Sequence, residues 1–308
     1  MFENRPKNPP PTASPKKEVL RGDPPSPKRG TPPEKFVYLN GDFLALEEAR
    51  ISPEDRGFLL GDGLFETIRS YNGRLFRWPQ HRARLESGLE ELRIPASEIP
   101  ERIPHIFDEL RVRNKIAEAV MRITISRGAG GTGYSWNPAA PRTVYATLRR
   151  PPDIPQRRKR GMTLETSSIP RPLPFTSVVK TISLGAMALA RLEAYADEAL
   201  LLDAGGFVAE GTASAVFFLF GQEFIRPEAA VLKSITAEVI EELRPVRVHR
   251  LSLEEARCAD AIFLASTGMG PIGVREWDGR SYPHRHPLIT ALQADFDRLV
   301  AVETGAGN

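Results

Sequence analysis

The sequence predicts a mixed α/β protein with two domains. Segments in which apolar and polar residues alternate, as in strands, are interspersed with segments whose apolar residues recur every three or four positions, as in helices. A Pro- and Arg-rich stretch, residues 149–161, interrupts this pattern near the middle of the 308-residue chain, which is long enough to bury a substantial core. We therefore expect an α/β domain over 36–149, a linker over 150–161, a second domain over 162–303 and a short tail over 304–308.

Residues 1–35 have the composition of a disordered, basic tail. They contain ten of the 28 prolines, eight Lys or Arg residues, four acidic residues and almost no large apolar side chains. Such a segment cannot bury enough apolar surface to offset the entropy lost on ordering. Because this segment carries the positive net charge and the remainder is close to neutral, we expect a solvated tail rather than a specific nucleic-acid or membrane contact.

The first domain is expected to begin with two hairpins. Asn-Gly dipeptides at 40–41 and 72–73 stand between strand-like segments, and this dipeptide favours two-residue hairpin turns. The remaining segments of this domain are predicted as helices at 78–92 and 103–114 and strands at 119–128 and 142–150.

The second domain is predicted to alternate strands and helices. Strands are expected at 162–169, 246–251 and 261–266, helices at 185–196, 234–243, 253–258 and 287–302, and hairpins turning at 203–206 and within 274–280.

Several function classes lack a signal in the sequence. No apolar run approaches the roughly 20 residues that span a bilayer, and no apolar signal core is present near residue 1, so the expected location is the cytoplasm. We find no P-loop, no GxGxxG motif after a strand and no metal-type Cys/His spacing. The single cysteine, Cys258, permits no internal disulfide and is assigned no catalytic role, and His284 and His286 are expected in a surface turn.

A lysine and a glutamate are the candidate catalytic pair. Lys180 lies where an extended segment gives way to a predicted helix, and Glu210 lies thirty residues later, at the end of a predicted hairpin among small and apolar residues. A lysine that forms a Schiff base and a carboxylate that keeps a pyridine nitrogen protonated are the groups a pyridoxal phosphate site requires. Taken alone, Lys180 would be better explained as a surface lysine whose apolar stem packs on the protein.

Three further segments could bind the phosphate of that cofactor. Ser234 precedes a predicted helix, so the N–H groups of Ile235 and Thr236 and the Thr236 hydroxyl could bind a dianion. Ser266 and Thr267 follow a buried strand, and Arg84 would add positive charge.

Longer motifs resemble those of the fold-type IV pyridoxal-phosphate enzymes, the class IV aminotransferases. The family includes branched-chain and D-amino-acid aminotransferases and aminodeoxychorismate lyase. "DRGFLLGDGLFETIRSYNGRLF" (55–76) with "HRARL" (81–85) is similar to the N-terminal signature of the family, and "EALLLDAGGFVAEGTASAVF" (198–217) with "SIT" (234–236) is similar to its C-terminal signatures. The resemblance covers residues 36–300.

The resemblance implies a role for each matching residue. Lys180 matches the Schiff-base lysine, Glu210 the pyridine-nitrogen glutamate and Arg84 the phosphate-binding arginine. The remaining phosphate-binding positions match Ile235, Thr236 and Thr267, with Ser266 beside them, and Phe65 matches an aromatic wall of the substrate pocket. The family also implies a small N-terminal α/β domain, a larger C-terminal pseudo-barrel domain, and a homodimer in which a neighbouring loop completes the pocket.

The sequence also departs from the family at several positions. Ser183 and Ala215 stand where asparagine is common, Ser234 and Ala237 differ from a Gly-Ile-Thr-Arg pattern, and Thr132 replaces an arginine of the lyase pattern in "ITISRGAGGTGYSWNPAAP" (123–141).

Because a carboxylate anchor of the lyase is absent at Thr132 and "LFETIR" is closer to aminotransferases, we expect a transaminase acting on an amino acid and a 2-oxo acid. A pyridoxal-phosphate lyase of the aminodeoxychorismate type is the first alternative. A non-catalytic pyridoxal-phosphate-binding protein is the second.

Overall fold

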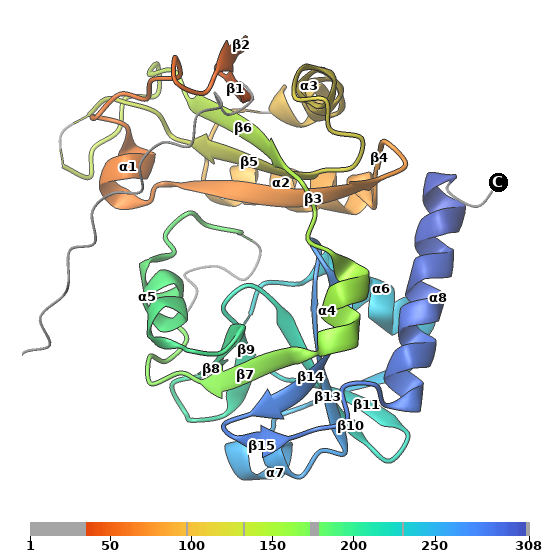
Figure 1. Ribbon diagram of the computed structural model, residues 1–308. Helices are drawn as coiled ribbons and strands as arrows, with labels where there is room; N and C mark the ends of the chain where they lie inside the picture. Colours follow the sequence, from red (N-terminus) through yellow and green to blue (C-terminus); the bar gives the residue numbers. More distant parts are fainter. Residues whose placement is uncertain (1–34, 97, 132, 173–178, 230, 306–308) are drawn as a thin grey trace, which may run out of the picture. The chain divides into compact units, whose positions relative to one another are not determined.

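The computed structural model describes residues 35–305, except 97, 132, 173–178 and 230 (Figure 1). Residues Glu34–Asn308 belong to one compact unit. The tail expected over 1–35 lies almost wholly outside the described residues, and Thr132 lies outside them too. The predicted domain limits therefore stay predictions. In the described part of the chain, no helix is long and apolar enough to span a membrane.

Six strands of the N-terminal half form an antiparallel sheet in the order β2-β1-β6-β5-β3-β4. The strands are β1 (Phe36–Leu39), β2 (Asp42–Ala45), β3 (Gly63–Tyr71), β4 (Arg74–Leu75), β5 (Val120–Ser126) and β6 (Thr143–Arg149). Both predicted hairpins are confirmed. Asn72 and Gly73 adopt φ values of 49° and 74°, and this left-handed backbone is the conformation that a two-residue turn of the Asn-Gly type requires.

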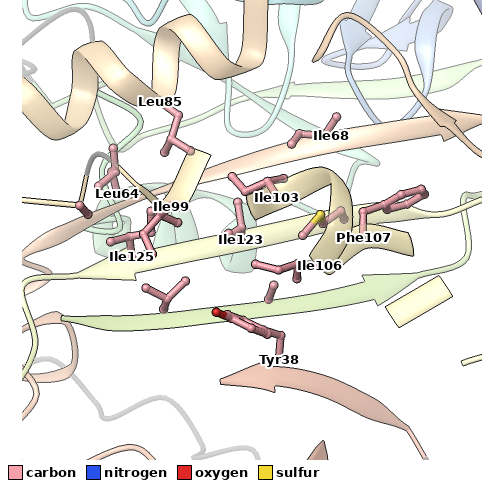
Figure 2. Packing of buried hydrophobic residues seen from close by; sticks show 14 of the residues in the cluster. Tyr38, Leu64, Ile68, Leu85, Ile99, Ile103, Ile106, Phe107, Ile123 and Ile125 are labelled. Carbon is pink, nitrogen blue, oxygen red and sulfur yellow. The ribbon is translucent and has the colours of Figure 1, made fainter. Parts of the chain in front are cut away.

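Three helices accompany this sheet: α1 (Arg56–Leu60), α2 (Trp78–Glu91) and α3 (Ile99–Arg113). Helices α2 and α3 were predicted, although α3 begins four residues earlier than expected, and the short α1 was not. One face of β3, β5 and β6 is apolar, and its side chains pack with Leu85 of α2 and Ile103 and Phe107 of α3 in a single core (Figure 2). The opposite face of the same strands borders a cavity.

The C-terminal half contains a second, nine-stranded sheet. Its order is β12-β11-β10-β13-β14-β7-β8-β9, and β15 pairs with β14. The strands are β7 (Met162–Thr166), β8 (Glu198–Leu202), β9 (Val208–Gly211), β10 (Ala215–Phe220), β11 (Glu223–Pro227), β12 (Val246–His249), β13 (Ala261–Ser266), β14 (Gly270–Trp277) and β15 (Arg280–Ser281). Strand β9, at one end of the order, also contacts β10 and β11, so the sheet curls into a half-barrel.

Alternation along β10 shows how this sheet is buried on both faces. Val216 and Phe218 pack in the core that also holds Trp277, whereas Phe217 and Leu219 pack in a second core with α6 (Ile235–Leu243) and α8 (Pro287–Thr304). Two-sided burial explains why "AVFFLF" is a continuous apolar run rather than an alternating one. The helix α7 (Leu253–Arg257) covers part of the first of these cores through Ala256.

The expected mixed α/β fold with a C-terminal pseudo-barrel is confirmed, and the structure shows in addition that the first sheet is antiparallel throughout. Within the predicted linker, the structure contains a helix, α4 (Ile154–Arg160), whose N-terminus is capped by the Asp153 carboxylate accepting from the Gln156 N–H at 2.9 Å. Pro155 is compatible with this helix because it lies in the first turn, where a backbone N–H has no helical acceptor. Helix α5 (Gly185–Glu193) begins where predicted and ends three residues earlier.

Candidate active site

A cavity of about 520 Å³ is lined by residues of both sheets and of the segments that join them. The lining includes seven of the predicted site residues: Phe65, Arg84, Lys180, Glu210, Ile235, Ser266 and Thr267. Thr236 is buried in the first turn of α6 beside Ile235 but is not part of the lining. Of the positions that depart from the family pattern, Ser183, Ala215 and Ser234 also line the cavity.

Lys180 is positioned by backbone contacts with β3 of the first sheet. The Phe65 N–H donates to the Lys180 carbonyl at 2.8 Å, and the Ile182 N–H donates to the Gly63 carbonyl at 3.1 Å. The Lys180 ammonium lies 4.7 Å from the centroid of the Phe65 ring. The helix that follows starts only at Gly185, so Lys180 belongs to an extended segment rather than to a helix boundary.

The electrostatic surroundings of Lys180 favour its neutral form. Burial, reinforced by the Arg84 guanidinium, lowers the pKa of Lys180 to about 8, although Glu66 and Glu210 oppose the fall. Among the described residues, no carboxylate lies within ion-pair distance of its ammonium group. A lysine with this pKa is partly unprotonated near neutral pH and can act as a nucleophile or a base.

Glu210 lies on β9 and forms an ion pair with Arg171, a residue that no motif in the sequence indicates. The Arg171 Nε donates to the Glu210 Oε1 at 2.5 Å, and the two side chains are only 10% and 18% exposed. Burial raises the pKa of Glu210, while Arg171 and Lys180 oppose this rise. Glu210 is thus a carboxylate with one fixed cationic partner at the cavity wall.

Glu198, on β8, holds the turn that follows Glu210. Its carboxylate accepts from the Thr212 N–H at 3.1 Å, the Thr212 hydroxyl and the Ser214 hydroxyl at 2.8 Å. A side chain at Gly211 would place its Cβ 2.6 Å from the Ser214 Oγ, so glycine is required for this close approach. The turn over residues 211–214, which lines the cavity, is therefore fixed by a buried carboxylate beneath it.

An anion-binding arrangement lies at the N-terminus of α6. The Ser234 hydroxyl caps the helix by accepting from the Ala237 N–H at 3.3 Å. The N–H groups of Ile235 and Thr236 have no acceptor within the helix because they belong to its first turn. Arg84 donates through Nη1 to the Lys233 carbonyl at 2.7 Å, which brings its guanidinium to this end of the helix. Positive charge and free N–H donors together favour a phosphate or a similar dianion.

Arg84 is held on its other edge by a buried carboxylate. The Arg84 Nε and Nη2 donate to the two oxygens of Glu66 at 2.6 and 2.9 Å, and the His81 Nδ1 lies 2.9 Å from the Glu66 Oε2. Burial alone would raise the pKa of Glu66, but Arg84 and His81 outweigh it and lower the pKa to about 2. Burial lowers the pKa of His81, and the bond to Glu66 opposes that fall.

These contacts engage three of the five N–H donors of the guanidinium. The orientation of Arg84 is therefore fixed, and the other two donors have no acceptor among the residues that the structure describes.

Five charged residues of the site were not predicted from the sequence. Arg122, Arg149 and Arg171 line the cavity, whereas Glu66 and Glu198 support it through hydrogen bonds to lining residues. Strand alternation gave a signal for two of them. Glu66 stands between Leu64 and Ile68 on the face that packs in the core, whereas Arg122 belongs to the opposite, cavity-facing side.

The fold and the site define a cleft with a half-buried lysine of lowered pKa, the half-buried carboxylate of Glu210 and a helix N-terminus suited to an anion. Residues 63–277 match the family described as Amino-transferase class IV. The chain belongs to this family.

Known proteins similar to the chain agree with the family assignment. A putative branched-chain-amino-acid aminotransferase of Methanocaldococcus jannaschii is 33% identical over 259 residues, which is 79% of this chain and 88% of that protein. A D-alanine aminotransferase of Staphylococcus epidermidis is 27% identical and covers 86% of this chain and 97% of its own length.

Among solved structures, the T.th. branched-chain amino acid aminotransferase with pyridoxamine 5'-phosphate is similar at a TM-score of 0.78 and 27% identity. The match covers 87% of this chain and 94% of that one.

Proposed function

We propose that Lys180 is the cofactor-binding lysine and general base of a pyridoxal-phosphate-dependent aminotransferase. The proposal depends above all on one observation: a half-buried lysine with a pKa of about 8 lines the same cavity as Glu210 and the N-terminus of α6. A solvated surface lysine would keep a pKa near its ordinary value, so the lowered pKa is not explained by that alternative. The chain would move an amino group between an amino acid and a 2-oxo acid.

The residues present fit pyridoxal phosphate. The phosphate would bind the two available N–H donors of Arg84, the N–H groups of Ile235 and Thr236, and the Thr267 hydroxyl, with Ser266 beside it. This donor set is cationic and rich in N–H groups, as a dianion requires. Glu210 would hold a proton at the pyridine nitrogen, and its ion pair with Arg171 keeps the carboxylate oriented toward a fixed position.

The bound cofactor supplies a carbonyl carbon for the amine and a ring that takes up electrons from the substrate α-carbon. Lys180 provides an amine that is neutral in part near pH 8, so it can attack a carbonyl carbon and, once released, accept a proton from the α-carbon. Arg171 stabilises the ionised form of Glu210 against the cost of its burial. Phe65 packs against the ammonium group and limits where it can move.

The substrates of the relatives include branched-chain amino acids and D-alanine, as their names state. An amino acid and a 2-oxo acid are therefore the substrate classes we assign, without a choice between L and D forms. A homodimer and a cytoplasmic location remain predictions. In the homodimer, a loop of a second copy would complete the pocket.

The test is a half-reaction of the holoprotein with single amino acids. An aminotransferase is expected to lose its yellow absorbance and form pyridoxamine phosphate when an L- or D-amino acid is added alone, and to regain the yellow form with a 2-oxo acid. The Lys180→Ala variant should fold, as judged by circular dichroism, yet fail to cycle. Wild-type activity in that variant would refute the role assigned to Lys180.

Two other outcomes would favour the alternatives. Pyruvate release from aminodeoxychorismate without amino transfer would indicate the lyase. A yellow protein that reacts with none of these compounds would indicate non-catalytic cofactor binding.

A further inference from the structure

The N-terminus of α2 and the C-terminus of α6 meet at one arginine, Arg77. Its Nη1 and Nη2 donate to the two carboxylate oxygens of Glu242, in the last turn of α6, at 2.8 and 2.7 Å. The same Nη2 lies 2.8 Å from the Glu303 Oε1, near the end of α8. The Arg77 side chain is only 9% exposed. Arg77 thus connects α2, a helix of the N-terminal half, to two helices of the C-terminal half.

This junction combines charge and apolar packing. Burial lowers the pKa of Arg77, but Glu242 and Glu303 outweigh burial and raise the pKa above its ordinary value. Phe76, the residue before Arg77, packs with Val239 of α6 and with Phe296 of α8 in one small core. A carboxylate in the last turn of a helix is disfavoured by the helix dipole, so Glu242 is best explained as the partner of Arg77.

The backbone of Arg77 is in an uncommon conformation. Its φ of 55° lies in the left-handed region, which an arginine seldom adopts and a glycine adopts freely. The Arg77 carbonyl accepts from the N–H groups of Gln80 and His81 at 3.1 Å each, so this conformation directs the chain from β4 into α2. An arginine where glycine would be less strained indicates that its side chain has a task.

The same two helices meet again at the proposed phosphate site. Arg84 follows Arg77 by seven residues along α2, and Glu242 follows Ile235 by seven residues along α6. At 1.5 Å per residue, each interval is about 10.5 Å long. The helices therefore run in opposite directions with matched contacts at both ends. One contact is Arg77 with Glu242, and the other is Arg84 with the Lys233 carbonyl at 2.7 Å.

We propose that Arg77 is a positioning residue that holds α6 against α2, so that the first-turn N–H groups of α6 and the Arg84 guanidinium face the same phosphate. This role rests on the proposed function, which assigns the cofactor phosphate to those groups. Arg77 is not among the described residues that line the cavity, so it acts through α6 rather than by touching the ligand. A shift of α6 along α2 would separate the two sets of donors, and the phosphate would lose contacts.

Charge and positioning predict opposite effects for Glu242→Gln. The substitution removes a negative charge, so its direct electrostatic effect would be to strengthen the binding of a dianion slightly. It also neutralises the partner through which Arg77 holds α6, so the loss of positioning would weaken that binding. Weaker binding of the phosphate group in this variant therefore identifies positioning.

The test measures how much the phosphate group contributes to cofactor binding. The ratio of the dissociation constants of pyridoxal and pyridoxal phosphate isolates this contribution, because the two compounds share the same ring and aldehyde. Fluorescence titration of the wild-type apoprotein should give a ratio of at least about ten, as expected for charge-assisted contacts to a phosphate.

Glu242→Gln should lower this ratio about threefold, which is within the range of a half-exposed ion pair, while the free energy of unfolding changes only slightly. Arg77→Gln, which loses both carboxylate partners, should lower the ratio further. Arg77→Lys keeps the charge and should retain part of the wild-type ratio.

Glu303→Gln is the matched control because it neutralises the other partner of Arg77 and leaves the contact with α6 in place. It should leave the ratio essentially unchanged. An undiminished ratio in Glu242→Gln, or equal losses in Glu242→Gln and Glu303→Gln, would overturn the positioning role. A wild-type ratio in a folded Arg77→Gln variant would overturn it as well.

The failure of this role can be told apart from the failure of the proposed function. If the wild-type protein prefers pyridoxal phosphate but the variants share that preference in full, only the role of Arg77 is wrong. If the wild-type protein binds both compounds equally, the assigned phosphate site fails and the role of Arg77 fails with it. The half-reaction with amino acids decides separately whether the loaded protein is an aminotransferase.

Discussion

Replacing Glu66 by glutamine removes the charge that holds Arg84 and His81 while nearly preserving the shape of the side chain. Glu66 is about 1% exposed and binds Arg84 through both oxygens at 2.6 and 2.9 Å. The pKa of Glu66 falls from 4.5 to about 2 in the folded protein. At about 1.4 kcal/mol per pKa unit, this fall corresponds to about 3 kcal/mol of stability. The loss of one partner of a buried ion pair typically costs about 3–5 kcal/mol, so the two magnitudes agree.

The pH dependence of this effect has a definite sign. Because the pKa of Glu66 is lower in the folded state than in the unfolded state, its stabilisation is fully present above about pH 5 and is lost as the pH falls toward 2. Urea unfolding of the apoprotein should therefore show Glu66→Gln about 3 kcal/mol less stable than wild type at pH 7. The difference should shrink as the pH decreases through 4 and 3.

Glu242→Gln provides a matched comparison. Glu242 also binds an arginine through both oxygens, with distances of 2.8 and 2.7 Å to Arg77, but its side chain is 51% exposed. Exposed ion pairs contribute about 0–1 kcal/mol, so this variant should change the free energy of unfolding only slightly. A cost below about 1 kcal/mol for Glu66→Gln, or a cost that does not depend on pH, would refute the role assigned to the buried carboxylate.

Three further outcomes are expected. Arg84→Ala should weaken pyridoxal phosphate binding by about 1.5–3 kcal/mol, measured by fluorescence titration, and unchanged affinity would mean that Arg84 does not bind the phosphate. The rate at which apoprotein Lys180 is labelled by an amine-reactive reagent should reach half its maximum near pH 8, and a midpoint above 10 would contradict the lowered pKa. Deletion of residues 1–35 should lower the isoelectric point from about 9.0 and leave melting temperature, cofactor content and turnover unchanged, whereas a loss of several degrees would mean that the tail docks on the rest of the protein.

Local signals in the sequence predicted most of the secondary structure, because the physical cause of each element lies within it. Asn72-Gly73 supplies the left-handed backbone of its turn, and Ser234 supplies a hydroxyl that caps α6. Helix α4 was not predicted because its composition resembles that of a linker, with Pro155 and a run of basic side chains. Its helical signals are limited to the Asp153 cap and the position of the proline in the first turn.

Only the site residues that belong to recognisable motifs could be predicted from the sequence. Lys180 and Glu210 were found through their spacing and their resemblance to a family, and the structure brings both to one cavity. The contact that positions Lys180 was not predictable, since it joins an extended segment to Phe65, more than one hundred residues earlier. A contact of that kind depends on how two distant segments pair, and the residues of one segment do not specify which other segment it will contact.

Arg122 illustrates what alternation can and cannot specify. In "VMRITIS", Met121, Ile123 and Ile125 share one face of β5 and Arg122 belongs to the other, so the sequence alone predicts a strand with one apolar and one partly polar side. On an isolated sheet that polar side would simply face water, and Arg122 would be an ordinary solvated arginine. Its chemistry changes only because the second sheet and the Lys180 segment enclose the same side, which removes water from the guanidinium and lowers its pKa. The functional meaning of the residue therefore arises from the approach of the two sheets, which neither strand specifies by itself.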